Sequence, residues 1–251
     1  MKRLLVLVCF IYIGIGQITS QIINVESKRI ATDTLGFSGT MGMSMSASRF
    51  TQSYVAAELS SQVQWKTNKN LYLLLGDFQI VNAGGESFNN SGFGHFRFNS
   101  KFSTKTSLEL FTQLQYNSVT KITARFLNGA GLRFKLSPYE TAKVYWGVAA
   151  MYEYEELSDP QIINKDIRLS TYLSFTLAPV KTITLRNTTY AQPLTGDFND
   201  YRLLNNTTLR FGITKNLSFS TDFSFLYDSR PPIDVPNINY QVKNGLNYRF
   251  D

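Results

Sequence analysis

Apolar and polar side chains alternate with a period of two over long stretches of the chain, most regularly in residues 105–154. There, Phe126 and Leu132 fall on one side of the alternation, and Arg125 and Arg133 fall on the other. A period of two places successive side chains on opposite faces of a β-sheet. The runs exceed the roughly 5–6 residues of ordinary strands and reach the roughly 9–11 residues that cross a bilayer at a tilt. The pattern therefore predicts membrane-spanning strands.

The same alternation predicts an all-β chain of about 12 strands. A soluble up-and-down barrel would show the same period, so the size of the barrel must decide which face is inside. A barrel of about 8 strands is just filled by its own side chains, whereas a wider one encloses space. Apolar residues pointing inward would leave a large unfilled cavity, so we expect them to face lipid around a polar lumen, in a closed antiparallel transmembrane β-barrel. The strands are predicted near residues 34–46, 52–66, 70–82, 92–102, 106–117, 120–136, 141–155, 166–178, 181–191, 200–213, 216–228 and 238–250.

The predicted connections fall into two alternating sets. Short turns at one end and longer loops at the other are typical of outer-membrane barrels, whose short turns are periplasmic. With an even number of strands, both termini are expected on the periplasmic side. The short set is 66–70, 103–106, 137–140, 178–181 and 214–216; the other set is 83–92, 156–165, 192–199 and 228–238, together with short connections at 47–51 and 117–120.

The N-terminus has the pattern of a secretory signal. Lys2 and Arg3 precede the apolar run 4–15, which is too short for the roughly 20 residues of a transmembrane helix. We predict a signal peptide over 1–20, a periplasmic tether over 21–33 and an outer-membrane β-barrel over 34–251. The single cysteine, Cys9, lies within the signal, so we expect neither a disulfide nor a thiolate-bound cofactor in the mature chain.

Several stretches together resemble a known family. They are GFGHFRFNSKFSTKTSLELFTQLQYNSVTKITARFLNGAGLRFKL, then YEYEE, RLSTYLSF and NDYRLLNNTTLRFGITKNLSFSTDFSF, and finally DSRPP followed by YQVKNGLNYRF. This pattern is similar to an uncharacterised family described as salt-induced outer-membrane proteins, in a version typical of Bacteroidota. The resemblance spans roughly residues 35–250. It implies location and fold, and it supplies no substrate or catalytic residue.

On the face expected to line the lumen, basic side chains outnumber acidic ones. Rings of Lys and Arg favour anions in a pore. The alternative is a lumen in which opposite charges pair and neutralise each other. The residues predicted to line the pore are Gln113, Arg125, Arg133, Arg168, Arg202 and Arg210.

No motif for catalysis or cofactor binding stands out. The single histidine, His95, has no adjacent serine and acid motif of a hydrolase. Glu153, Glu155 and Glu156 cluster near the outer rim, which indicates a hydrated rim or a loose cation site rather than the paired carboxylates of a hydrolase. Glycines in the run 128–131 are expected to ease packing within a strand. We therefore predict no enzyme activity, no cofactor and no metal. We also predict no nucleic-acid partner, because the basic residues are dispersed rather than gathered into a stripe.

Two functions remain open from the sequence. One is a passive pore for small solutes or ions, which the family resemblance alone links to salt or osmotic stress. The other is a structural or surface-interaction barrel with a closed lumen that uses the loops at 83–92, 156–165 and 228–238. In both cases the expected partners are outer-membrane lipid and the barrel-assembly machinery, which would recognise the amphipathic C-terminal strand. The expected location is the cell outer membrane of a Gram-negative bacterium.

Overall fold

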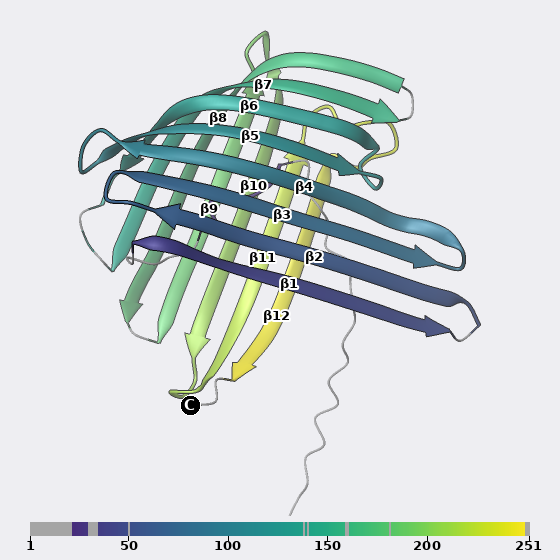
Figure 1. Ribbon diagram of the computed structural model, residues 1–251, viewed down its shortest axis with the longest axis horizontal. Coiled ribbons are helices and arrows are strands. Elements are labelled where there is room, and N and C mark those ends of the chain that lie inside the picture. Colours follow the sequence, from purple (N-terminus) through teal and green to yellow (C-terminus); the bar gives the residue numbers. More distant parts are fainter. Residues whose placement is uncertain are drawn as a thin grey trace, which may run out of the picture.

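The computed structural model describes residues 22–29, 35–49, 51–137, 139, 141–158, 161–180 and 182–248. Twelve antiparallel strands form one sheet in which each strand pairs with its neighbours in the sequence, as the alternation predicts (Figure 1). The predicted signal peptide and the residues after Tyr248 lie outside the described part. The strands are β1 (Gly36–Arg49), β2 (Ser53–Lys66), β3 (Asn70–Ala83), β4 (Glu86–Lys101), β5 (Thr106–Asn117), β6 (Ile122–Lys135), β7 (Ala142–Ser158), β8 (Gln161–Val180), β9 (Ile183–Leu194), β10 (Asp197–Gly212), β11 (Leu217–Asp228) and β12 (Ile238–Tyr248).

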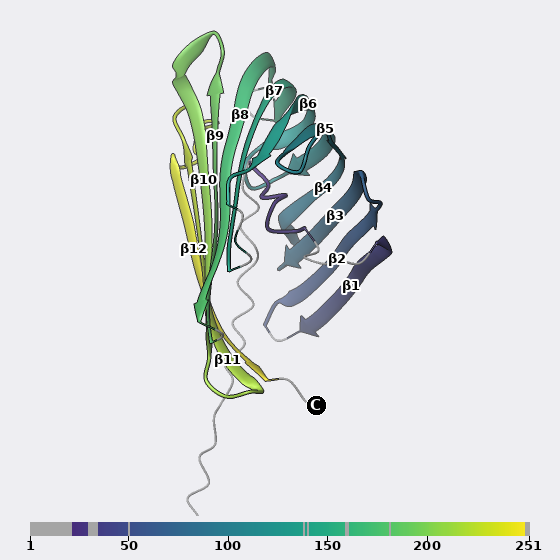
Figure 2. The ribbon, with the colours of Figure 1, turned by 90° about the vertical axis from the view of Figure 1, so that its left-hand side faces the viewer.

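The sheet folds back on itself into two facing walls. One wall holds β1 to β6, the other holds β8 to β12, and the sheet turns over at β7 (Figure 2). Among the described residues, β1 pairs only with β2 and β12 only with β11, so the sheet is rolled but not closed. The predicted 12 antiparallel strands are confirmed, whereas the predicted closure is not seen, because the described sheet has two free edges. No helix among the described residues has the length and apolarity needed to span a membrane.

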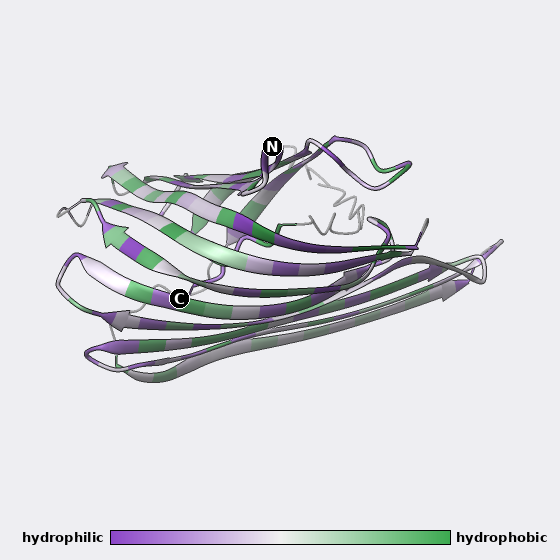
Figure 3. Cartoon of the chain, turned by 90° about the horizontal axis from the view of Figure 1, so that it is seen from above, coloured by the Kyte–Doolittle hydropathy of each residue, from purple (hydrophilic) through white to green (hydrophobic). Residues whose placement is uncertain are grey.

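The two faces of the sheet differ as the period of two requires. On β4, Phe96 is 40% exposed on the outer face, whereas the next residue, Arg97, is 4% exposed on the inner face. On β5, Leu114 is 61% exposed and Gln113 only 5%. The resulting banding of hydrophilic and hydrophobic residues runs along the strands (Figure 3). Apolar side chains thus face outward and polar side chains face the space between the walls.

Aromatic side chains gather on the outer face near both ends of the strands. Near the turn between β2 and β3, Trp65 stacks on Tyr72 with their ring centroids 5.2 Å apart. At the opposite end, the ring centroids of Tyr201 and Tyr227 lie 5.4 Å apart. Two aromatic bands that flank an apolar belt are the arrangement of outer-membrane barrels.

Three of the predicted long loops are wrong. The strands continue through most of 83–92, 156–165 and 192–199, and β3 joins β4 through Gly84 and Gly85, whose φ angles of 63° and 88° allow a two-residue turn. Gly84, Gly85 and Gly196 lie at the tips of hairpins, so the strands on either side run further than the sequence predicts.

The connection after β11 is the one irregular connection longer than a few residues at this end of the described strands; it spans residues 229–237. The length asymmetry from which we inferred periplasmic termini is therefore much weaker than the sequence suggested.

Glycines on the inner face lie where the sheet turns over. A Cβ atom added to Gly131 would lie 2.1 Å from the carbonyl oxygen of Val148. One added to Gly129 would lie 2.1 Å from the ring of Phe111. The prediction that the run 128–131 eases packing within a strand is confirmed, because the absence of side chains lets β6 and its neighbours curve tightly.

We expect the substitution Gly131→Ala to destabilise the sheet by about 1–3 kcal/mol, the usual cost of forcing extra atoms into a packed site. The obstacle is the backbone of β7, which cannot move without disturbing the ladder. Urea unfolding of the refolded protein in detergent, followed by tryptophan fluorescence, measures this. Gly94→Ala is the matched control, because a Cβ atom there meets nothing within 4 Å. Equal midpoints for the two variants would contradict the assignment.

Candidate functional site

Residues 22–29 lie between the two walls of the sheet (Figure 2). Ile22 is 4% exposed and packs in a cluster with residues of β8, β9, β10 and β11, among them Leu204. Val25 is 2% exposed and packs against Leu73 and Leu75 of β3 and against Phe93 of β4. This differs from the simple tether predicted over 21–33, because two of the segment's apolar side chains are buried against opposite walls.

Polar groups fix the segment to both walls as well. Asn24 donates from its side-chain amide to Asn206 of β10 over 2.9 Å. Lys28 pairs with Asp77 of β3, and the carbonyl of Lys28 accepts a hydrogen bond from Gln62 of β2. The segment is therefore held in place along its length and from both sides.

The carboxylate of Glu26 is the centre of the first charge network. Its Oε1 accepts from Arg29 Nε at 2.7 Å and from Arg97 Nη1 at 3.0 Å. Its Oε2 accepts from Arg133 Nη2 at 2.8 Å. Arg97 lies on β4 and Arg133 on β6, so one carboxylate on the segment links two strands of the sheet. Charge-assisted hydrogen bonds of this kind are about twice as strong as neutral ones.

Burial by itself would raise the pKa of Glu26, because it disfavours the charged carboxylate. The positive charges of Arg133, Arg29 and Arg97 outweigh burial and lower the pKa from its ordinary 4.5 to about 2. Glu26 is therefore charged in the docked segment at any physiological pH. By linkage, the docked state is favoured fully above pH 4.5, and this contribution is lost as the pH falls toward about 2.

Glu109 of β5 is the second acid of the first network. It accepts from Arg29 Nη2 at 2.8 Å, from the amide of Asn99 at 2.6 Å and from the hydroxyl of Tyr172 at 2.8 Å. Tyr172 belongs to β8, so Glu109 and Tyr172 connect the two walls. The hydroxyl of Tyr190 on β9 accepts from the backbone N–H of Glu26 at 3.3 Å. The first network thus links the two walls, and the N-terminal segment lies at the centre of the network.

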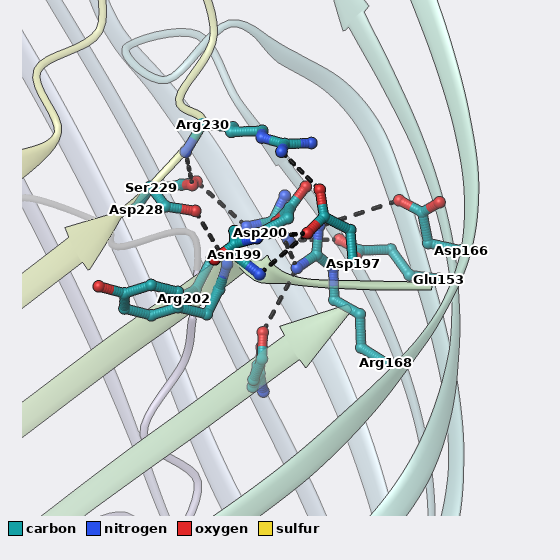
Figure 4. A network of polar contacts seen from close by, with 12 residues as sticks. Glu153, Asp166, Arg168, Asp197, Asn199, Asp200, Arg202, Asp228, Ser229 and Arg230 are labelled. Carbon is teal, nitrogen blue, oxygen red and sulfur yellow. Dashed lines mark hydrogen bonds and ion pairs between the residues drawn. The ribbon is translucent and has the colours of Figure 1, made fainter. Parts of the chain in front are cut away.

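A second charge network surrounds Glu153 of β7 (Figure 4). Its carboxylate lies 2.5 Å from Arg125 Nε, 2.8 Å from Arg168 Nε and 2.7 Å from Arg202 Nη1. Glu153 is 1% exposed and Arg125 is fully buried. The three arginines come from β6, β8 and β10, so this network also joins one wall to the other.

Further acids complete the second network. Asp200 accepts from Arg168 at 2.8 Å, Asp228 accepts from Arg202 at 3.1 Å, and Glu155 accepts from Arg202 at 3.2 Å. Asp166 also lies 3.9 Å from Arg168 Nη2, so three arginines here meet five carboxylates. In the first network, three arginines meet the two carboxylates of Glu26 and Glu109. The second network therefore carries an excess of negative charge, and the first an excess of positive charge.

The structure brings together only part of the predicted pore lining. Arg125, Arg168 and Arg202 belong to the second network, and Arg133 belongs to the first. Of the other two predicted residues, Gln113 reaches the first network only through His95, whose Nε2 accepts from Arg97 Nε over 3.4 Å, and Arg210 belongs to neither network. Gln113 is buried beside His95, with 2.9 Å between its Oε1 and His95 Nδ1, and the exposed Arg210 donates to Ser218 over 3.2 Å near the turn after β10.

The predicted rim cluster of three glutamates does not exist. Glu153 and Glu155 point inward and pair with arginines, whereas Glu156 lies on the other face and accepts from Gln161 at 3.4 Å. Adjacent residues of a strand point to opposite faces, so Glu155 and Glu156 cannot act together. Within the described residues, no group of three or more His, Cys, Asp or Glu side chains is arranged to hold a metal ion.

Sequence reasoning missed Glu26, Arg29, Tyr172 and Tyr190. A signal for the buried segment was nevertheless present in β3, where Leu73 and Leu75 point inward although the outer face of that strand is also apolar. Apolar side chains facing a polar lumen require an apolar partner. Val25 and Ile23 supply it.

The chain belongs to a family of unknown function, whose model, described as "Protein of unknown function, DUF481", matches residues 40–250. This agrees with the uncharacterised family that the sequence resembles. No curated protein matches the chain. Among solved structures it is similar to the NanC porin, at 12% identity and a TM-score of 0.45 over 84% of this chain and 99% of that one. It is also similar to the KdgM porin, at 14% identity and a TM-score of 0.43 over 86% and 99% of the two chains.

We expect Glu153→Gln to lower the free energy of unfolding by about 3–5 kcal/mol, because it leaves buried arginines without their shared carboxylate. Asp197→Asn is the control, since the Asp197–Arg230 pair is solvent-exposed and contributes little. The two urea unfolding midpoints, measured in the same detergent, make the comparison. A Glu153→Gln midpoint as high as that of the control would show that the second network does not hold the walls together.

Proposed function

We propose that this member of the family is an outer-membrane β-barrel whose lumen is occluded at rest by its own N-terminal segment, and that it passes small polar solutes when the segment leaves. The observation that carries the proposal is the position of residues 22–29, which lie inside a polar lumen and bind both walls. The apolar outer face and the two aromatic bands support the membrane location. The proposed activity is transport and involves no catalysis.

In a membrane, the two free edges of the sheet would need partners, because lipid cannot satisfy exposed backbone groups. We propose that β1 and β12 pair with each other there. Their directions suit an antiparallel pair, since the number of strands is even. Both also place apolar side chains at alternate positions, with Met43 and Met45 on β1 and Val242 and Leu246 on β12. We further propose that both termini are periplasmic and that β12 is the segment recognised by the barrel-assembly machinery.

A cavity of about 470 Å³ beside the segment supports a path for solutes. It lies between β1–β5 and β10–β12, and polar side chains such as Asp77, Gln79, Ser91 and Asn206 contribute to its lining. Ile22, Asn24 and Lys28 form part of its wall, so withdrawal of residues 22–29 would widen it.

The proposed pore would keep a basic lining at the first network when it opens. While the segment is docked, Arg29, Arg97 and Arg133 already outnumber the carboxylates of Glu26 and Glu109. Its departure removes Glu26 and Arg29 together, which leaves Arg97 and Arg133 facing the single carboxylate of Glu109. A net positive ring favours anions. The anion preference predicted from the sequence is thus assigned to the open state.

The second charge network favours a different function. Its ion pairs join β6, β7, β8, β10 and β11 without any residue of the N-terminal segment, so they would persist after the segment leaves. A lumen that stays closed there would make the protein a structural or surface-interaction barrel. Conductance distinguishes the two functions directly.

We expect Glu26→Gln to increase the conductance of planar bilayers containing the purified protein, because the segment loses its charge-assisted bonds to Arg97 and Arg133. Single-channel recording measures open probability, and reversal potentials under a salt gradient measure selectivity. Asp234→Asn is the control, since it removes an exposed pair with Lys121 in the long connection. Silent bilayers with Glu26→Gln and with a variant lacking residues 22–29 would favour the closed barrel, and cation selectivity would contradict the basic open pore.

We expect acid to open the unsubstituted protein. As the pH falls from 4.5 toward 2, protonation of Glu26 removes the stabilisation of the docked segment. The open probability should rise over this range, and Glu26→Gln should flatten the rise. The same recordings across a pH series measure it. A rise of equal size in both proteins would show that another group controls opening.

A further inference from the structure

Four polar side chains form a closed ring of hydrogen bonds on β9 and β10. Asn187 donates to Thr207 over 2.7 Å, and the hydroxyl of Thr207 donates to Asn205 over 2.9 Å. Asn205 donates to Thr189 over 2.8 Å, and the hydroxyl of Thr189 donates back to Asn187 over 3.1 Å. We name these four residues the polar quartet.

The polar quartet lies on the outer face of the sheet. The residues between its members point inward: Thr188 is 5% exposed, and Asn206 accepts a hydrogen bond from Asn24 in the lumen. Side chains alternate across a strand, so the quartet faces the opposite way. In the register of the sheet, apolar neighbours flank it on both sides: Thr189 lies opposite Leu173 of β8, and Asn205 lies opposite Phe225 of β11.

The quartet lies at the middle of the apolar belt. On β10, Tyr201 of one aromatic band comes four residues before Asn205, and Phe211 comes four residues after Thr207. In the orientation of the proposed function, this depth is the centre of the bilayer. Polar groups there are costly unless they are satisfied.

The ring satisfies only part of what these side chains can bind. Each asparagine amide has two N–H donors, and the ring uses one of them. Lipid chains offer no acceptor for the others. A partner that presents polar groups at the same depth would satisfy them.

We propose that the polar quartet is the contact between two copies of this chain in the membrane. A second copy inserts with the same orientation, so it necessarily presents the same four side chains at the same depth. An isologous contact then places one ring against the other, and amide and hydroxyl groups can bond across it. The inference rests on the membrane location under the proposed function, and it is independent of whether the lumen conducts.

The test is the oligomeric state of the protein reconstituted in lipid vesicles, measured by single-molecule photobleaching over a range of protein-to-lipid ratios. We expect the unsubstituted protein to form dimers. We expect a combined variant to associate about tenfold more weakly, as the loss of one or two hydrogen bonds in a membrane implies. The variant carries Asn187→Leu, Thr189→Val, Asn205→Leu and Thr207→Val. These apolar residues suit lipid, so folding should be retained.

Asn128→Leu is the matched control, because Asn128 is an exposed polar residue on the outer face of β6, in the opposite wall. It should leave the dimer unchanged. Monomers at every ratio, dimers that persist in the combined variant, or dimers lost through Asn128→Leu would each overturn the proposal. Slower migration of the boiled sample on detergent gels reports the folded barrel separately, so a chain that fails to insert counts against the membrane location instead.

Discussion

Glu26 holds together parts of the molecule that the sheet alone leaves apart. Its carboxylate binds Arg97 and Arg133 on one wall, and its backbone N–H donates to the hydroxyl of Tyr190 on the other wall. Without Glu26, Arg97 and Arg133 on the same wall would have only the carboxylate of Glu109 as their acidic partner. Buried charges are tolerated only when they are paired and hydrogen-bonded. The lumen in its present form therefore depends on a residue outside the sheet.

The N-terminal segment in turn depends on both walls of the sheet. The partners of Ile22 come from β8 to β11, and those of Val25 come from β3 and β4. The binding site for the N-terminal segment exists only when both walls are in place. Residues 22–29 precede every described strand, yet their contacts require strands from both walls. Because no backbone ladder of the described strands includes the segment, its departure would break no strand pairing, which is what the proposed opening requires.

The sequence allowed the strands to be predicted and the lumen only in part. Alternation identifies β5, β6 and β7 because their inward positions, among them Gln113, Arg125 and Glu153, fall at every second residue. The same alternation could not pair Arg125 with Glu153 or Arg202 with Asp228, because these contacts depend on the register of neighbouring strands and on how the sheet rolls. Residues 22–29 have no period at all, so their burial could be inferred only from Leu73 and Leu75. The hairpin tips were misjudged because glycines at a tip, such as Gly84 and Gly85, resemble part of a longer loop.

Alternation also separates two surfaces that are adjacent in sequence. Asn205 and Asn206 are identical in chemistry and neighbours in the chain, yet Asn205 belongs to the polar quartet and Asn206 binds Asn24 in the lumen. Residue type cannot distinguish them, whereas their positions in the strand do, because successive side chains point to opposite faces. Because each strand residue serves only one face, a substitution at the quartet changes the outer surface without touching the contacts of residues 22–29. The proposed association and the proposed occlusion can therefore be altered independently in one strand.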